Sequence, residues 1–179
     1  MHEHAPPRER EYDLVRKARW GNEAAFAELY RLHARAVYTL AYRLTASTDR
    51  AEDITQDTFL RMLRFLPGFR AGTPLRPWLK KVAANAAIDL MRRDRHVLDD
   101  ALIESAPSGA EGADASMDAE GLLRRMPPLA RTLFWLHEIE GWSHQELARR
   151  FGQSPSWSKS IVSRALARLR VELEQGEPG

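Results

Sequence analysis

The sequence predicts an all-α protein of two small helical domains joined by a flexible acidic linker, with a helix-turn-helix as the second domain. Three observations support this fold class. Apolar residues recur at threes and fours over long stretches, which is the period of a helix with one buried face. No segment shows the alternation that a half-buried strand requires. A stretch rich in Ala, Ser, Gly and Asp separates two periodic regions, as a linker does.

The composition is that of a globular protein, with 44% hydrophobic and 29% charged residues in a chain of 179. Cysteine is absent, which excludes disulfides, thiolate metal sites and a cysteine nucleophile. The N-terminus has no apolar signal segment, and no apolar run is long enough to span a bilayer. We therefore expect a cytoplasmic protein that makes no membrane contact of its own.

Charge is distributed unevenly. The formal net charge is +2, but residues 98–121 contain seven acidic side chains and no Lys or Arg; without these seven negative charges the remainder would have a net charge of +9. Basic bodies joined by an acidic strip suggest a polyanion partner. A purely solubilising role for these charges explains the pattern equally well at this point.

The first domain is expected at residues 11–97, after a flexible tail at 1–10. Residues 11–66 show long helical periodicity with few breakers, and the apolar face begins with Phe26, Leu29, Val37, Leu40 and Leu44. These residues predict helices that share one buried side.

A polar break near residue 48 divides this periodic stretch. Asp49 is the expected N-cap of the next helix, with Glu52 completing a capping box, and Pro67–Gly68 ends that helix. Its expected apolar positions are Ile54, Phe59, Met62, Leu63 and Leu66. Another helix is expected from about Trp78 to Arg95.

The second domain is expected at residues 122–174, after the linker at 98–121. Pro127–Pro128 opens a helix that ends at Gly141. These boundaries use the preference of proline for the first helical turn and of glycine for the position after the last.

A helix-turn-helix pattern follows. Ser143 and Glu146 form a capping box for a short helix that ends at Gly152. Ser154 then caps a long basic helix with Pro155 in its first position. A short helix, a tight turn and a long helix rich in Lys and Arg are typical of this DNA-binding motif.

In such a motif, the N-terminal residues of the second helix reach base edges in the major groove. The candidates here are Ser156, Trp157, Lys159, Ser160, Ser163 and Arg164. Lys159 and Arg164 suit guanine edges or phosphates. Two helices with a glycine turn also occur in bundles that bind no DNA, so this pattern alone leaves that alternative open.

Aromatic and basic side chains occur together from Phe69 through the following helix. Unpaired bases bind to aromatic rings with nearby cations, and the amide of Asn85 suits a base edge. The alternative is a solvated basic face above an apolar core. For Trp78 we favour a core position, because its spacing matches that of Leu79 and Val82.

Asp53 and Asp57 lie four residues apart on one helix face. Like charges at this spacing cost a few tenths of a kcal/mol, which a basic partner would offset. From the spacing alone, neutralisation by Arg50 and Arg61 on a solvated face is the simpler interpretation.

No catalytic residue, cofactor or metal site is predicted. The histidines are scattered. His137 and Glu138, beside Glu140, have the chemistry of metal ligands, but they suit a helix surface better than a metal site. The nucleophile-elbow, phosphate-loop and dinucleotide motifs are absent from the sequence.

Several stretches, in order, resemble the extracytoplasmic-function (ECF) subfamily of bacterial RNA polymerase sigma factors, which belongs to the sigma-70 family. The matching residues are 26–30, 51–59, 77–93, 136–148, Lys159–Ser160 and Arg164–Ala165. The resemblance extends from about residue 12 to 173. One motif alone would be weak evidence for the family. All of these motifs in the family's order, with a linker between the two halves, are specific to it.

The resemblance implies a promoter-recognition subunit and not an enzyme. Its first domain, called region 2, would bind the clamp helices of the largest subunit of core RNA polymerase through Asp53, Gln56, Asp57, Phe59 and Leu60. Asp53 and Asp57 would then face a binding partner, whereas spacing alone favoured a solvated face neutralised by Arg50 and Arg61. The same domain would capture a flipped base of the melted −10 element through Phe69, Arg70, Lys80, Lys81, Asn85, Asp89, Arg92 and Arg93.

The second domain, called region 4, would contact the polymerase flap and bind the −35 duplex through the six residues of the last helix. The resemblance also implies an anti-sigma factor as a partner. Two departures leave the −35 preference open: Trp157–Ser158 replaces a small polar residue followed by Val, and Ile161 replaces a basic residue. Trp157 packs either on the DNA or in the core.

Three other functions stay as alternatives. The first is a helix-turn-helix DNA-binding regulator that acts without polymerase, which would leave the first domain without a role. The second is an enzyme acting on nucleic acid, which the absence of clustered acids or metal ligands in the sequence disfavours. The third is a helical scaffold.

Overall fold

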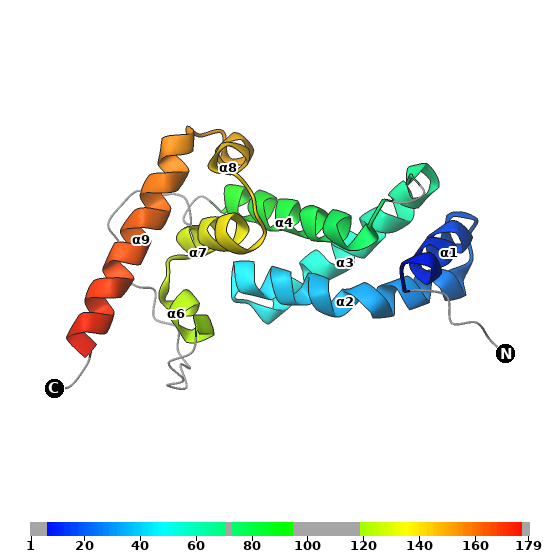
Figure 1. Cartoon of the computed structure of the whole chain (residues 1–179), viewed down its shortest axis with the longest axis horizontal. Helices are drawn as coiled ribbons and strands as arrows, with labels where there is room; N and C mark the ends of the chain where they lie inside the picture. Colours follow the sequence, from blue (N-terminus) through cyan, green and yellow to red (C-terminus); the bar gives the residue numbers. More distant parts are fainter. Residues whose placement is uncertain (1–6, 71–72, 95–118, 177–179) are drawn as a thin grey trace. The chain divides into compact units, whose positions relative to one another are not determined.

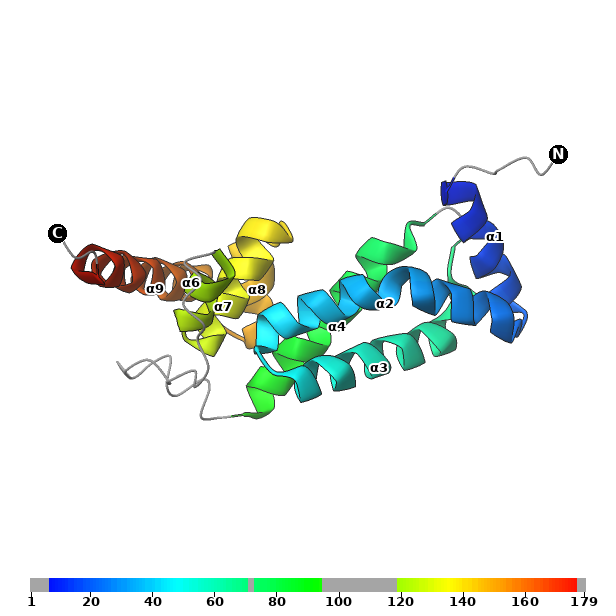
Figure 2. The same ribbon diagram turned by 90° about the horizontal axis from the view of Figure 1, so that it is seen from below.

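The structure is a computed structural model that describes residues 7–70, 73–94 and 119–176. The regular elements of these residues are helices, with no strand among them, which confirms the all-α fold class (Figures 1 and 2). The chain divides into two compact units, Met1–Tyr42 with Ser47–Ala86 and Arg43–Ala46 with Ala87–Gly179. The predicted linker lies outside the described residues except for its last three.

Helix α1 spans Pro7–Arg19, so helical structure begins inside the tail expected at residues 1–10. It ends at a turn in which Gly21 has a φ of +83°, a left-handed conformation that glycine adopts without steric cost. The periodicity of residues 11–66 does not predict this break, because so short a turn barely interrupts the apolar pattern.

Helix α2 spans Glu23–Thr45. Asn22 caps it, because its Oδ1 accepts a hydrogen bond of 2.8 Å from the backbone N–H of Ala25. The buried face includes Leu29, Val37, Leu40, Ala41 and Leu44. Of the predicted apolar face, Phe26 alone is only half-buried.

Helix α3 spans Thr48–Phe65 and continues into a 3₁₀ turn, η1, at Leu66–Gly68. The prediction of Asp49 as the N-cap is wrong: the hydroxyl of Ser47 accepts the hydrogen bond from the first turn, at 3.3 Å. The helix begins two residues earlier than expected, so Asp49 lies in its first turn, where a carboxylate interacts favourably with the helix dipole.

Helix α4 spans Leu75–Arg93 and begins three residues before the predicted Trp78. Pro77 therefore lies in the first turn, where proline is tolerated because those N–H groups have no acceptor within the helix. The buried side consists of Leu75, Leu79, Ala83, Ala84, Ala87, Ile88 and Met91. Its many alanines allow other helices to approach closely.

The second unit contains α6 at Ala119–Arg125 and α7 at Pro128–Phe134. A π-helical turn, η2, continues α7 over Trp135–Ile139. The predicted helix from Pro127–Pro128 to Gly141 is thus present with a widened last turn. Gly141 follows it with a φ of +75°.

Helices α8, His144–Phe151, and α9, Pro155–Gly176, form the predicted helix-turn-helix. The capping box is confirmed: the Ser143 hydroxyl accepts from the Glu146 N–H at 3.1 Å, and the Glu146 carboxylate accepts from the Ser143 N–H at 2.9 Å. Gly152 ends α8 with a φ of +66°. These signals are local, which is why the sequence suffices to place them.

The helices of the second unit share one apolar core. Its most buried members include Leu129, Leu133, Leu136, Leu147, Ala148, Ile161 and Val162.

In the parts of the chain that the structure describes, every helix is too short or too polar to cross a membrane.

Candidate functional site

A groove of about 570 Å³ lies between α2 and α3, and we call it the α2–α3 groove. It is lined by Phe26, Tyr30, Ala34, Arg35, Tyr38, Glu52, Thr55, Gln56, Phe59, Leu60 and Leu63. Tyr30, Leu60 and Leu63 are each exposed over more than two fifths of their surface. Large apolar side chains gathered at the surface mark protein interaction sites.

Three of the five residues expected to bind polymerase line this groove: Gln56, Phe59 and Leu60. Asp53 is exposed and lies three residues before Gln56 and seven before Leu60, so the three share one face of α3. Phe59 is buried, and its ring centroid lies 4.6 Å from that of Tyr30. It therefore supports the groove instead of projecting from it.

The fifth residue, Asp57, forms an ion pair with Arg61, whose Nε lies 2.8 Å from Oδ2. An exposed pair at this spacing contributes about 0.3–0.5 kcal/mol. Among the described residues, Asp53 has no such partner. The two carboxylates of the predicted signature are thus unequal, and Asp53 is the one whose charge the chain leaves for a partner.

A second hollow, of about 380 Å³, lies between α1 and the loop that precedes α4, and we call it the α1 pocket. The loop contributes Phe69, Arg70 and Thr73. Helix α1 contributes Glu9, Tyr12, Asp13, Val15, Arg16 and Arg19. Phe69 and Arg70 are predicted −10 contacts; the α1 residues were missed, because the sequence has no signal that shows where α1 packs.

Helix α1 is bonded to the chain on both sides of this loop. The Arg19 guanidinium donates to the carbonyl oxygen of Pro67 at 2.9 Å. The backbone N–H of Leu75 donates to Oε1 of Glu11 at 3.3 Å. The loop is therefore fixed at its start and at its end by the same helix.

The other carboxylate oxygen of Glu11 faces the buried imidazole of His33, 3.4 Å from Nε2. Burial lowers the pKa of His33 below its usual value, and the charge of Arg76 lowers it further, while Glu11 opposes both. The anchor of α1 thus includes a histidine that the fold favours in its neutral form.

The ring of Trp78 lies between Phe65 and Phe69, with centroids 6.2 and 5.8 Å away and edge-to-face orientations. Such pairs contribute about 0.5–1.5 kcal/mol each. Trp78 is half-buried and so is not the core residue that its spacing suggested. The reason is its place in the first turn of α4, where these two rings cover it only in part.

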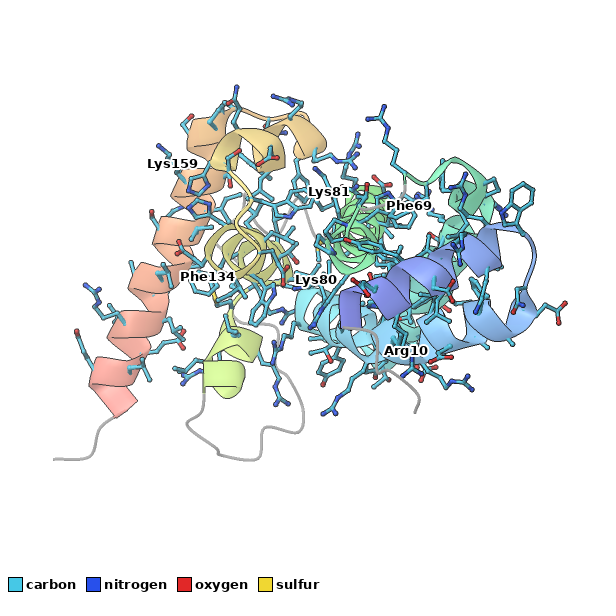
Figure 3. All side chains as sticks on the ribbon, turned by 45° about the vertical axis from the view of Figure 1, so that its right-hand side comes forward. Arg10, Phe69, Lys80, Lys81, Phe134 and Lys159 are labelled. Atoms are coloured by element: carbon cyan, nitrogen blue, oxygen red, sulfur yellow. The ribbon has the colours of Figure 1, made fainter. Side chains whose placement is uncertain are left out.

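The other residues expected to contact the −10 element are all on α4: Lys80, Lys81, Asn85, Asp89, Arg92 and Arg93. Lys81, Asn85, Asp89 and Arg92 recur at threes and fours, so they lie along one face of α4. Figure 3 labels Lys80 and Lys81. None of these six lines the α1 pocket. The Oδ1 of Asn85 is buried and has no hydrogen-bond partner among the described residues.

The predicted −35 contacts lie at the start of α9, where Figure 3 labels Lys159. Five of the six are exposed: Ser156, Lys159, Ser160, Ser163 and Arg164. Trp157 is half-buried, with its ring 5.3 Å from that of Phe151 in α8. It therefore packs against the motif with one part of its ring and leaves the other part accessible.

The other departures from the family pattern lie on the inner side of α9. Ile161 is buried, and Ser158 is fully buried with its hydroxyl 3.0 Å from Nδ1 of His144. These residues therefore determine how α9 packs on α8, and they leave the exposed face of α9 unchanged.

Two histidines stack beside this contact: the rings of His137 and His144 lie 3.9 Å apart. The His137 Nδ1–H donates to the carbonyl oxygen of Trp142 at 2.7 Å. Burial first, and then the charges of His137 and Lys159, lower the pKa of His144. Among the described residues, no three His, Cys, Asp or Glu side chains are grouped to hold a metal ion.

Comparison with known families gives two matches along the chain. The model described as Sigma-70 region 2 matches residues 29–97, and the one described as Sigma-70, region 4 matches residues 116–169. The first match includes the lining of the α2–α3 groove except Phe26, together with the loop of the α1 pocket, but it begins after α1. The second includes the helix-turn-helix.

Similar proteins are sigma factors. RNA polymerase sigma factor CarQ of Myxococcus xanthus is 32% identical over 171 residues, which are 91% of this chain and 97% of CarQ. RNA polymerase sigma factor NccH of Alcaligenes xylosoxydans xylosoxydans is 30% identical over 176 residues, with 92% and 95% covered. ECF sigma factor SigE of Mycolicibacterium smegmatis is 32% identical, but this chain covers only 63% of it.

Two solved structures have a similar fold. RpoE of Bartonella quintana, in complex with the anti-sigma factor NepR, is 27% identical with a TM-score of 0.51, covering 85% of this chain and 98% of RpoE. CnrH in complex with the cytosolic domain of CnrY is 24% identical with a TM-score of 0.53, covering 94% of this chain and 99% of CnrH. The latter likeness concerns the fold alone.

Proposed function

The chain belongs to the ECF group of the sigma-70 family, and we propose here which of its surfaces bind polymerase and which bind DNA. As a sigma factor, it acts with RNA polymerase in promoter-specific transcription initiation. The proposal assigns residues 11–97 to polymerase and −10 binding and residues 122–174 to −35 binding, with 98–121 as the linker and 1–10 as a tail. The protein works in the cytoplasm, with polymerase, and has no catalytic activity of its own.

The α2–α3 groove is the observation that carries the polymerase assignment. Leu60 and Leu63 are each about half exposed, so burial of the rest of each side chain by a partner would contribute about 0.7–1.5 kcal/mol. Asp53 adds an unpaired carboxylate on the same helix face as Leu60. Apolar anchors beside an accessible charge are typical of a specific protein interface. We therefore propose that the polymerase clamp helices bind across α3 at this groove.

The face of α4 from Lys81 to Arg92 is proposed to hold the melted −10 strand. Basic side chains track a single-stranded backbone, and aromatic rings such as Phe69 stack on its bases.

The exposed start of α9 is proposed to read the −35 duplex. Lys159 and Arg164 are five positions apart and both exposed, which suits contacts to phosphate and to guanine edges. Because Trp157 packs partly on Phe151, it contributes its accessible edge to the DNA surface. The remainder of the second unit is proposed to contact the polymerase flap.

An anti-sigma factor is a proposed regulatory partner. The similar RpoE was solved with the anti-sigma factor NepR, and an apolar groove that must bind polymerase is a surface that such a protein would need to cover. The anti-sigma factor and polymerase would then compete for the α2–α3 groove, and only one of them would bind at a time.

Run-off transcription tests the proposal. Purified core polymerase is combined with this protein on a pool of promoter fragments from its source. We expect new, defined start sites that disappear with Asp53→Ala but persist with Glu23→Ala, which removes an exposed acid at the start of α2, away from the face of α3 that carries Asp53. Tight duplex binding without any core-dependent start site would instead support a regulator that acts without polymerase.

A further inference from the structure

Two imidazole rings stack where the helix-turn-helix joins the turn before it. The rings of His137 and His144 lie 3.9 Å apart, with an angle of 28° between their planes. His137 belongs to the π-helical turn η2, and His144 is the first residue of α8. Such widened turns are frequent at functional sites, and the polymerase and DNA contacts proposed above use neither ring.

Each ring has its own hydrogen-bond partner. The carbonyl oxygen of Trp142 accepts from Nδ1–H of His137 at 2.7 Å. Nδ1 of His144 lies 3.0 Å from the hydroxyl of Ser158, a fully buried residue of α9. A hydroxyl both donates and accepts, so it can bond to a bare Nδ1 of the neutral ring and equally to the Nδ1–H of the charged ring. His144 can therefore gain a proton without losing its partner.

The charged groups that face His144 come from each element packed against it. Across the stack lies His137, and a carboxylate oxygen of Glu138 is 3.7 Å from its Nε2. Lys159 faces His144 from α9, while Glu146, the acid in the first turn of α8, is used in the capping box. Burial first, and then the charges of His137 and Lys159, lower the pKa of His144, against the opposing charge of Glu138. The free protein therefore favours the neutral ring.

Lys159 also belongs to the surface that is proposed to bind DNA. It is exposed at the start of α9, where Figure 3 labels it. A duplex that binds there brings phosphates, whose negative charge offsets that of Lys159 and favours a second cation beside it. DNA thus neutralises one of the groups that oppose protonation of His144 in the free protein.

We propose that His144 is a proton switch of the helix-turn-helix, neutral in the free protein and protonated from solvent when duplex DNA binds at the start of α9. This proposal rests on the proposed −35 binding and adds a regulation to that surface. Coupling between two ligands of one protein is reciprocal. A duplex that promotes protonation of His144 therefore binds more tightly as the pH falls.

His144→Gln and His33→Gln form a matched pair of variants. Each removes one histidine whose pKa is lowered first of all by burial, and each leaves a polar side chain in its place. His144 lies in the helix-turn-helix, whereas His33 lies on α2 in the first unit. A general effect of losing a titrating histidine would therefore appear equally in both variants.

The measurement is fluorescence anisotropy of fluorescein-labelled duplex DNA of mixed sequence, with the full chain alone and in complex with core polymerase. Affinities are compared at about pH 7.5 and about pH 6.0, a range in which imidazoles gain a proton. We expect the wild-type affinity to rise about fivefold on acidification, at the low end of couplings between two ligands. His33→Gln should keep this rise, and His144→Gln should reduce it to less than about twofold.

Ser158→Val tests the hydroxyl partner. Valine is the usual residue of the family at this position, so the fold should accommodate it. Without the hydroxyl, the Nδ1–H of the charged ring has no acceptor at this place, which disfavours that form. The rise in affinity on acidification should therefore disappear, while the affinity at the higher pH stays close to that of the wild type. Equal losses at both pH values would assign Ser158 to packing alone and contradict its role in the switch.

NMR of the Cε1–H of His144 observes the proton directly, and the titration should move to higher pH when the duplex is added. An unchanged titration would overturn the proposal, as would an equal pH dependence in the wild type and His144→Gln. So would a wild-type protein that binds no duplex either alone or with core polymerase. Failure of the proposed function would be seen elsewhere, as a lack of core-dependent start sites in run-off transcription, so the two failures are distinguishable.

Discussion

The two hollows of the first unit lie in one small helical body, but their walls differ in chemistry. The α2–α3 groove is lined mainly by aromatic and aliphatic side chains, with one Arg and one Glu. The α1 pocket is lined by five charged residues and two aromatic rings. Apolar anchors suit another protein, whereas cations beside rings suit a nucleotide. Under the proposed assignment, one domain would separate its protein partner from its nucleic-acid partner by the side chains that line each hollow.

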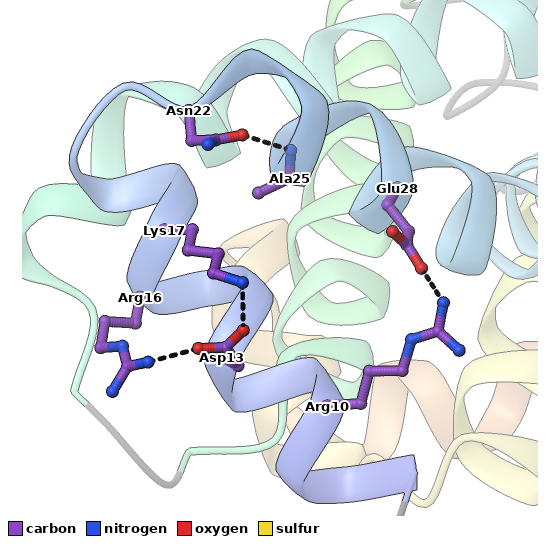
Figure 4. A network of polar contacts seen from close by, with 7 residues as sticks. All are labelled: Arg10, Asp13, Arg16, Lys17, Asn22, Ala25 and Glu28. Carbon is purple, nitrogen blue, oxygen red and sulfur yellow. Dashed lines mark hydrogen bonds and ion pairs between the residues drawn. The ribbon is translucent and has the colours of Figure 1, made fainter. Parts of the chain in front are cut away.

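The two hollows also differ in what holds them. The groove is formed by two helices, α2 and α3, and its floor includes the buried Phe59, whose ring packs against Tyr30. The pocket depends on a separate helix, α1 (Figure 4), held by side-chain bonds at Arg19 and Glu11. Changes that loosen α1 should therefore affect DNA binding before they affect polymerase binding.

The largest expected effect is on polymerase binding by Leu60→Ala. Removal of an interface anchor typically costs 2 kcal/mol or more, so affinity for core polymerase should fall at least about tenfold while single-strand binding stays unchanged. The control is Leu32→Ala, an equally exposed leucine on α2 outside the groove. Core binding by fluorescence anisotropy checks this, and an equal loss in both variants would contradict the assignment.

Phe69→Ala should produce the reverse effect. Loss of one stacking ring costs about 1–3 kcal/mol per base, so single-strand affinity should fall about fivefold or more with core binding intact. Phe65→Ala is the matched control, because Phe65 also packs edge-to-face against Trp78 but does not line the α1 pocket. If both variants lose single-strand binding alike, Phe69 acts through Trp78 and not on the DNA.

Ser143→Ala should leave both hollows unchanged and weaken only the second unit. Loss of the N-cap hydroxyl costs about 1 kcal/mol, because the Glu146 N–H loses its acceptor. Hydrogen exchange of the α8 amides should become faster, with Ser160→Ala, an exposed serine of α9, as the control. Faster exchange in α3 as well would show that the two units are coupled.

The smallest expected effect is a dependence on pH. Because the pKa of His33 is below its usual value in the folded chain, the unfolded chain binds a proton more readily as the pH falls through about 6.5. The free energy of unfolding should therefore decrease on acidification, and α1 should loosen with it. Urea unfolding at pH 7.5 and 5.5 checks this, and His33→Gln should reduce the difference. If the free energy of unfolding of His33→Gln changes with pH as much as that of the wild type, titratable groups other than His33 cause the dependence.

The local signals of the second unit were predictable from sequence. Ser143, Glu146 and Gly152 lie within ten residues of one another, and a capping box and a left-handed glycine depend on no distant contact. The cap of α3 was not predicted, because Ser47 and Asp49 are both good caps and the path of the preceding chain decides between them.

The hollows were predictable only in part. The resemblance to sigma factors named Gln56 and Leu60 in the groove and Phe69 and Arg70 in the pocket. Periodicity assigned Leu63 to the core, because it cannot show which part of an apolar face a neighbouring helix leaves uncovered. The α1 wall of the pocket depends on tertiary contacts of residues far apart in sequence, for which a single sequence offers no signal.

The most direct test of this separation is one experiment on two variants. Leu60→Ala and Phe69→Ala are each measured for affinity to core polymerase and to single-stranded DNA dodecamers of mixed sequence. We expect a crossover, in which Leu60→Ala loses polymerase binding and keeps DNA binding, while Phe69→Ala does the opposite. Parallel losses of both activities in both variants would contradict it.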